Sequence, residues 1–150
     1  MNLDVAVCLP RDAETVALIR GVVTHALRSF GVTSECVEDI RLALSEACTN
    51  VVEHAADDDE YEVRLQLDEQ RVAISIKNTG AGFDADALAD TMPDESSTRG
   101  RGVAIMRALM DSVEFTSEPE RGTLVHLVKA LAVDPGAPLT RIRRAPDEPA

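Results

Sequence analysis

Aromatic residues and positive charge are scarce in this sequence of 150 residues. It has no tryptophan, one tyrosine and three phenylalanines, so stacking of bases on aromatic rings is not an expected mode of binding. Acidic residues outnumber basic ones, and the formal net charge is −12. Nucleic acids and anionic membranes repel such a chain, so we expect neither as a direct partner. The charge is compatible with a basic protein partner.

Cysteines and long apolar segments are also few. The three cysteines, Cys8, Cys36 and Cys48, are odd in number, and their spacing matches no zinc motif. No apolar run approaches the length of a membrane-spanning helix, and the first residues do not form a signal-peptide pattern. We expect reduced thiols in the core of a cytoplasmic protein. A catalytic cysteine stays open as an alternative, with no evident histidine partner.

Hydrophobic patterning predicts one domain over residues 1–132 and a disordered, proline-rich tail over residues 133–150. Period-two alternation predicts strands over residues 3–9, 61–67, 71–77, 112–118 and 123–131. Helical spacing predicts helices from a cap at Asp12 to Gly31, from a cap at Ser34 to Ala55, and over residues 101–111. This order predicts an α/β fold, a two-layer sandwich with a mixed sheet and helices on one face.

The predicted helix over residues 34–55 contains an acid and an amide four residues apart, in the stretch "LSEACTNVVEHA". Glu46 and Asn50 share one face of the helix and lie beside its apolar stripe, at the border of the core. A carboxylate accepts a proton, and an amide oxygen is a hard ligand that suits Mg²⁺. The pair is suited to nucleotide chemistry, although the same spacing also occurs on solvated helix edges.

Two glycine motifs follow. Gly80 and Gly82, in "NTGAGFD", come directly after a predicted strand and permit close approach of the backbone to a ligand. An ordinary glycine turn is the alternative.

The second motif, "RGRGVAIMRALMD", places Gly100 and Gly102 at a helix start, where they alternate with Arg99 and Arg101. Free N–H groups at a helix start attract phosphates, and the arginines can contact a terminal phosphate. A helix start with solvated arginines is the alternative. Neither a Walker motif nor a Rossmann fingerprint is present.

The order of these motifs resembles that of the anti-sigma-factor serine kinases of the GHKL superfamily, which have a histidine-kinase-like ATPase domain. The resemblance rests on "LSEACTNVVEHA", "IKNTGAGFD", "GRGVAIMRALMDSVEF" and "GTLVHLVKAL", and it covers roughly residues 1–131. It implies the Bergerat α/β sandwich, the cofactors ATP and Mg²⁺, and an ATP-dependent protein-serine kinase. It also implies a homodimer that binds a sigma factor and phosphorylates a serine on an antagonist with a STAS-type fold.

The resemblance also implies roles for single residues. Glu46 would be the general base and Asn50 the Mg²⁺ ligand. Asn78 stands where the family usually has aspartate, the residue that binds the adenine amino group. Because of this replacement, a non-catalytic nucleotide-binding switch, which sequesters a regulator without phosphorylating it, is the alternative function.

The glycines and the segment between them receive roles in the same way. Gly80 and Gly82 would shape the adenine pocket. Residues 83–99 would form a lid over ATP. Gly100 and Gly102 would approach the phosphates.

Asn78→Asp is expected to tighten the binding of ATP and to weaken that of GTP. An aspartate carboxylate only accepts hydrogen bonds, which favours the adenine amino group, whereas an asparagine amide both donates and accepts. The neutral hydrogen bond should cost ATP on the order of 1 kcal/mol relative to aspartate. Titration calorimetry with both nucleotides measures the change. If the wild-type chain rejects GTP as strongly as the variant does, other groups read the base.

Overall fold

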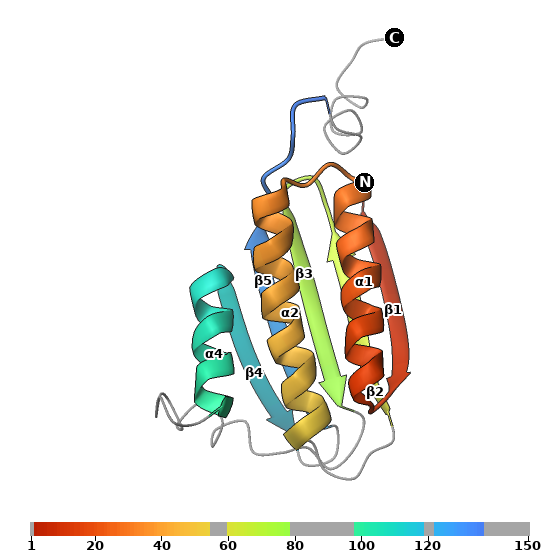
Figure 1. Cartoon of the computed structure of the whole chain (residues 1–150), viewed down its shortest axis with the longest axis vertical. Helices are drawn as coiled ribbons and strands as arrows, with labels where there is room; N and C mark the ends of the chain where they lie inside the picture. The colour runs from red at the N-terminus through yellow and green to blue at the C-terminus, as the bar shows by residue number, and fades with distance from the viewer. Residues whose placement is uncertain (1, 55–59, 79–97, 119–121, 137–150) are drawn as a thin grey trace.

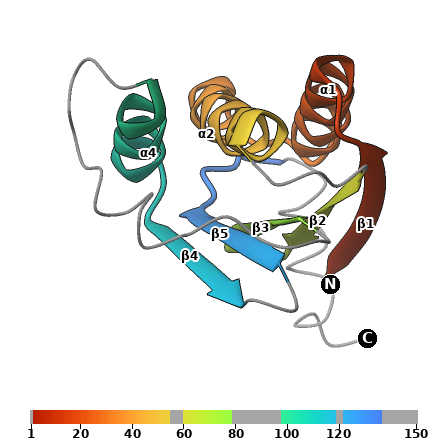
Figure 2. The same cartoon turned by 90° about the horizontal axis from the view of Figure 1, so that it is seen from below.

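The computed structural model describes residues 2–54, 60–78, 98–118 and 122–136. These residues form two layers, a five-stranded sheet and three helices that all cover the same face of it (Figures 1 and 2). The predicted α/β sandwich with helices on one face is therefore confirmed. Within the described part, no helix is both long and apolar enough to cross a membrane.

The helices and strands follow the predicted order. The strands are β1 (Leu3–Pro10), β2 (Glu60–Leu67), β3 (Arg71–Asn78), β4 (Ser112–Glu118) and β5 (Gly122–Ala130). The helices are α1 (Ala13–Ser29), α2 (Ser34–His54) and α4 (Thr98–Leu109).

Capping residues set the ends of the first two helices. Asp12 caps α1, and its carboxylate accepts a hydrogen bond of 3.0 Å from the backbone N–H of Glu14. Gly31 ends the turn after α1 with a φ of 84°, a conformation that glycine adopts without strain. The predicted cap of α2 is off by one residue, because the hydroxyl of Thr33, and not that of Ser34, accepts from the N–H of Cys36.

Every strand pairing in the sheet is antiparallel, so the expected mixed sheet is wrong. The strand order is β1-β2-β3-β5-β4. Two helices connect β1 to β2, and the extra reversal brings β2 back antiparallel to β1. The strands β3 and β4 do run in the same direction, because both are antiparallel to β5. They never pair, since β5 lies between them.

The core lies between the sheet and the helices. Alternate strand residues such as Ile74 and Leu127 face the helices and are fully buried, as is Leu44 of α2. Cys36 and Cys48 are buried as expected, but Cys8 is exposed, because it alternates along β1 with Val7 and Leu9, which face the core. Burial raises the pKa of the Cys48 thiol to about 12, which disfavours the reactive thiolate.

The chain after β5 remains attached to the domain. Val133 forms a bridge with Val32, and the N–H of Asp134 donates to the carbonyl of Gly31 at 2.9 Å. The expected boundary at residue 133 is therefore too early. Residues 137–150 of the expected tail lie outside the described residues.

Truncation after residue 136 is expected to leave the free energy of unfolding unchanged, whereas truncation after Ala130 lowers it. The shorter chain loses three backbone hydrogen bonds, which residues 131–134 make to Gln70, Gly31 and Thr33. At about 1 kcal/mol each, the loss is roughly 2–4 kcal/mol. Urea denaturation of both truncated chains measures it. A large loss on removal of residues 137–150 alone would show that the distal tail docks.

Candidate functional site

Parts of two helices and one strand meet at one end of the sandwich, and they bring together residues that are far apart in the sequence. These are the C-terminal half of α2, the end of β3 and the start of α4 (Figure 1). Glu46 and Asn50 come from α2, Asn78 is the last residue of β3, and Gly102 lies in the first two turns of α4. The structure thus places two of the sequence motifs against each other where α4 packs on α2.

Gly102 faces two polar residues of α2, Glu46 and Asn50. A Cβ atom built on Gly102 would lie 2.9 Å from Oε2 of Glu46 and 3.6 Å from Nδ2 of Asn50. Carbon and oxygen do not approach to 2.9 Å without a shift, so any side chain at position 102 must displace the Glu46 carboxylate. Because Gly102 has no side chain, there is room for the Glu46 carboxylate beside α4.

The Glu46 carboxylate is half-buried, and its surroundings favour the protonated form. Burial is the largest cause of the raised pKa of Glu46, and the negative charge of Glu53 raises this pKa further. The positive charge of Arg101 has a smaller, opposite effect. A carboxylate held in this way has an increased affinity for a proton, which a general base needs.

Glu53 was not among the residues singled out from the sequence. It lies two helical turns beyond Glu46 and influences the same carboxylate. The spacing of seven residues, which puts both acids on one face of α2, was the available signal.

Asn50 and Asn78 are buried asparagines with unpaired polar atoms. Asn50 is 5% exposed, and its Nδ2 has no hydrogen-bond partner among the described residues. Asn78 is fully buried with both amide atoms unpaired in that part of the chain. Its neighbour across the sheet, Tyr61, directs its hydroxyl to Thr15 at 2.8 Å instead. Buried amides are nearly always paired, so these atoms are suited to a polar ligand.

The donors at this end of the molecule suit a nucleotide and Mg²⁺. Asn50 offers an amide oxygen to a metal ion, and the start of α4 offers backbone N–H groups to phosphates. The described residues contain no cluster of three His, Cys, Asp or Glu side chains. Mg²⁺ that arrives with phosphates needs few protein ligands, so a site without such a cluster is compatible with it.

The remaining predicted site residues are only partly described. Arg101 is exposed beside Glu46. Arg99 and Gly100 belong to the first turn of α4. Gly80, Gly82 and most of the predicted lid lie outside the described residues.

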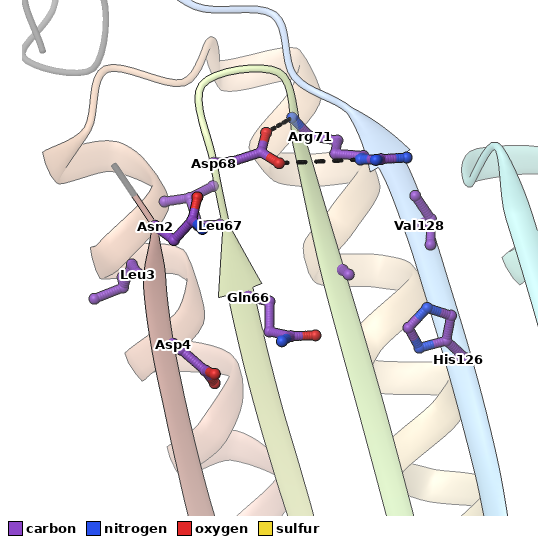
Figure 3. Close-up of a pocket in the computed structure, with 10 residues that line it drawn as sticks. Asn2, Leu3, Asp4, Gln66, Leu67, Asp68, Arg71, His126 and Val128 are labelled. Atoms are coloured by element: carbon purple, nitrogen blue, oxygen red, sulfur yellow. Dashed lines mark hydrogen bonds and ion pairs between the residues drawn. The ribbon is translucent and has the colours of Figure 1, made fainter. Parts of the chain in front are cut away.

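A separate hollow of about 340 Å³ lies on the sheet face that no helix covers (Figure 3). Asp4, Gln66, Arg71 and His126 are among the residues that line it. Arg71 begins β3 and Asn78 ends it, so this hollow and the Glu46 region lie at opposite ends of the strand. The hollow is therefore not part of the candidate site.

Comparison with known proteins identifies the family of this chain. The profile of the histidine kinase-like ATPase domain matches residues 9–129. The serine-protein kinase RsbW of Bacillus velezensis is 33% identical over 134 residues, which are 82% of this chain and 82% of that protein. The RsbW kinase of Bacillus subtilis is 32% identical, with the same coverage.

Solved structures show the same fold at low sequence identity. The RsbU and RsbW domains of a Mycobacterium tuberculosis protein match with a TM-score of 0.66 and 19% identity, over 86% of this chain and 32% of that one. The SiaB-SiaC complex of Pseudomonas aeruginosa matches with a TM-score of 0.57 and 13% identity, over 84% and 88% of the two chains.

Glu46→Gln is expected to raise the free energy of unfolding at neutral pH but not in acid. The pKa of Glu46 is higher in the folded chain than in the unfolded one. Below the unfolded pKa, about 4.3, both states are protonated and glutamine replaces the acid without effect. As the pH rises through that value, Glu46 loses its proton in the unfolded chain before it does so in the folded one. The free energy of unfolding of the wild type therefore falls, whereas that of the variant, which has no carboxylate at this position, does not.

Urea denaturation of both proteins at acid and neutral pH measures this difference. Glu35→Gln, a change at the exposed start of α2, is the matched control. If the stability difference between the wild type and Glu46→Gln does not change with pH, burial of the ionised Glu46 carboxylate does not destabilise the folded chain.

Proposed function

Because this chain belongs to the histidine kinase-like ATPase domain family, and within it to the RsbW serine-protein kinases, we propose that Glu46, Asn50 and the start of α4 transfer the γ-phosphoryl group of ATP to a serine. The chain is a protein serine kinase and anti-sigma factor. The proposed acceptor is a serine on a small antagonist with a STAS-type fold. The supporting observation is the contact of Gly102 with Glu46 and Asn50.

Glu46 is the proposed general base. Its carboxylate accepts the proton of the serine hydroxyl as the serine oxygen bonds to the γ-phosphorus, and the bond from that phosphorus to the β–γ bridging oxygen breaks to release ADP. Phosphoryl transfer depends mainly on positioning and charge neutralisation. The raised pKa of Glu46 helps, because it increases the proton affinity of the base at the moment of attack.

Asn50 and α4 are proposed to hold the phosphates. Bound Mg²⁺ would neutralise charge that develops on the phosphate oxygens. The amide of Asn50 is the proposed protein ligand for it, and Arg101 supplies a positive charge on the other helix. The unpaired amide of Asn78 is proposed to bind the adenine edge, since it is buried at the end of β3 with donor and acceptor both free among the described residues.

The wider assignments are proposals of the same kind. We propose that the chain acts in the cytoplasm as a homodimer and that the anti-sigma activity is exerted by binding a sigma factor directly. These follow from the family and need separate tests. Analytical ultracentrifugation tests the dimer, and co-purification with a candidate sigma factor tests the second partner.

Glu46→Gln is expected to keep ATP binding and to lose phosphoryl transfer by roughly 10²–10⁴-fold, the usual cost of losing a general base. Incubation of each protein with Mg·ATP and candidate STAS-type partners, followed by intact-mass analysis of the partner, measures transfer as a gain of about 80 Da per phosphoryl group. Glu35→Gln should transfer at the wild-type rate, because Glu35 lies in the first turn of α2.

Two results would contradict the proposal. Transfer at the wild-type rate by Glu46→Gln removes that residue from the mechanism. If the wild-type chain binds ATP and a partner but the mass of the partner does not increase, the chain is a non-catalytic switch, the alternative function that the asparagine at position 78 suggested.

A further inference from the structure

A lysine lies on the helix-facing side of β5, where the alternation of the strand predicts an apolar residue. Val125 and Leu127 face the helices and are buried, and Lys129 follows them on the same side of the strand. The side chain of Lys129 is only 18% exposed. The methylene groups of a lysine can cover apolar surface in such a place, but its ammonium group needs polar partners.

The ammonium group of Lys129 joins the two helices that form the candidate site. Its Nζ donates a hydrogen bond of 2.7 Å to the backbone carbonyl of Leu109, the last residue of α4. The same Nζ lies 3.7 Å from the carboxylate of Asp39 on α2. The last carbonyls of a helix have no partners within the helix, and a cation beside them also complements the helix dipole. Lys129 therefore links the C-terminal end of α4 to α2.

This link lies two turns away from the candidate site on both helices. On α2, Asp39 precedes Glu46 by seven residues, and on α4, Leu109 follows Gly102 by the same number. Seven residues are two turns, or about 10 Å, so each pair shares one face of its helix. The helices run antiparallel and lie side by side (Figures 1 and 2). Thus α4 is held on α2 at two places, at Gly102 and through Lys129.

The chain that follows α4 is attached to the same part of β5. The N–H of Asp111 donates to the carbonyl of Val128 at 2.9 Å, and the Asp111 carboxylate accepts from the N–H of Ala130 at 2.6 Å. These two hydrogen bonds flank Lys129 along the strand. They fasten the end of α4 to the sheet, and Lys129 adds the link to α2.

We propose that Lys129 is a positioning residue for phosphoryl transfer, because it sets the position of α4 along α2 and thereby that of Gly102 relative to Glu46. This inference rests on the proposed function, in which the start of α4 holds phosphates and Glu46 is the base. A helix is rigid over two turns, so a shift where Lys129 holds α4 also moves the start of α4. A misplacement of about 1 Å between reacting groups can cost 10²-fold in rate.

Three substitutions separate this role from simple capping of α4. Lys129→Met keeps the apolar stem and removes the ammonium group. Asp39→Asn leaves Lys129 able to cap α4 and removes the charge on α2, so it weakens only the link between the helices. Lys129→Arg keeps both the charge and the donor. The matched control is Arg64→Met, which removes a 2.6 Å ion pair with Asp4 between β1 and β2, on the sheet face that no helix covers.

The first readout is the NMR spectrum of the chain without nucleotide, which does not depend on the proposed function. The backbone amide of Gly102 and the side-chain amide of Asn50 report how α4 packs on α2, two turns from the substitutions. Lys129→Met and Asp39→Asn should shift both signals by more than their line widths. Lys129→Arg and Arg64→Met should leave them at the wild-type positions. If Lys129→Met does not fold, Asp39→Asn provides the test.

The second readout is phosphoryl transfer from Mg·ATP to the STAS-type partner that the wild-type chain phosphorylates. Lys129→Met and Asp39→Asn should lower kcat by roughly tenfold or more and change the KM for ATP by less than about threefold, because positioning acts mainly in the transition state. Lys129→Arg and Arg64→Met should retain the wild-type kcat. Loss of stability alone would lower kcat only by the unfolded fraction, which urea denaturation of each variant gives.

The proposal is overturned if the signals of Gly102 and Asn50 stay unchanged while those near residue 109 shift, because Lys129 then only caps α4. It is also overturned if Arg64→Met shifts the two signals equally, or if Asp39→Asn transfers at the wild-type rate. If the wild-type chain phosphorylates no partner, the proposed function fails. The NMR signals then still decide whether Lys129 sets the position of α4.

Discussion

The close packing of α4 on α2 at Gly102 is the constraint on which the site depends. The carboxylate of Glu46 lies close to where the Cβ atom of a larger residue 102 would be, so a side chain at that position would displace the carboxylate. The same contact brings the start of α4, with its free N–H groups, beside Asn50. One helix contact thus positions the proposed base, the amide of Asn50 and the backbone proposed to bind phosphates, which suits a reaction that depends on positioning.

The candidate site contains polar groups that are buried without full solvation or hydrogen bonding by the described residues. Glu46 is partly desolvated near a second acid, and the amides of Asn50 and Asn78 are buried without partners in the described part of the chain. Each of these features is unfavourable for folding. A nucleotide that supplies the missing partners binds the folded chain only, and so stabilises it. The cost to stability and the capacity to bind have the same physical origin.

Local sequence signals predicted the helices and strands well. They failed for strand order and for the end of the domain, which depend on contacts between residues far apart in the sequence. Asp12 and Gly31 identified both ends of α1, because capping and positive φ are properties of single residues. The sequence did not show that β5 would lie between β3 and β4, because strand order depends on which strands pair across the fold. Val133 was assigned to the tail for the same reason, since its bridge to Val32 joins segments about a hundred residues apart.

For the site, the sequence by itself determined the residue types and their local geometry. The four-residue spacing of Glu46 and Asn50 puts them on one helix face, and the glycines and arginines from residue 99 to 102 mark a helix start. Tertiary structure alone decided that Gly102 faces these two side chains and that Glu53 and Arg101 act on the Glu46 carboxylate. It also decided that Asn78 is buried without a hydrogen-bond partner among the described residues. Periodicity describes one helix or strand at a time, whereas burial, pKa and close approach arise only when separate elements pack together.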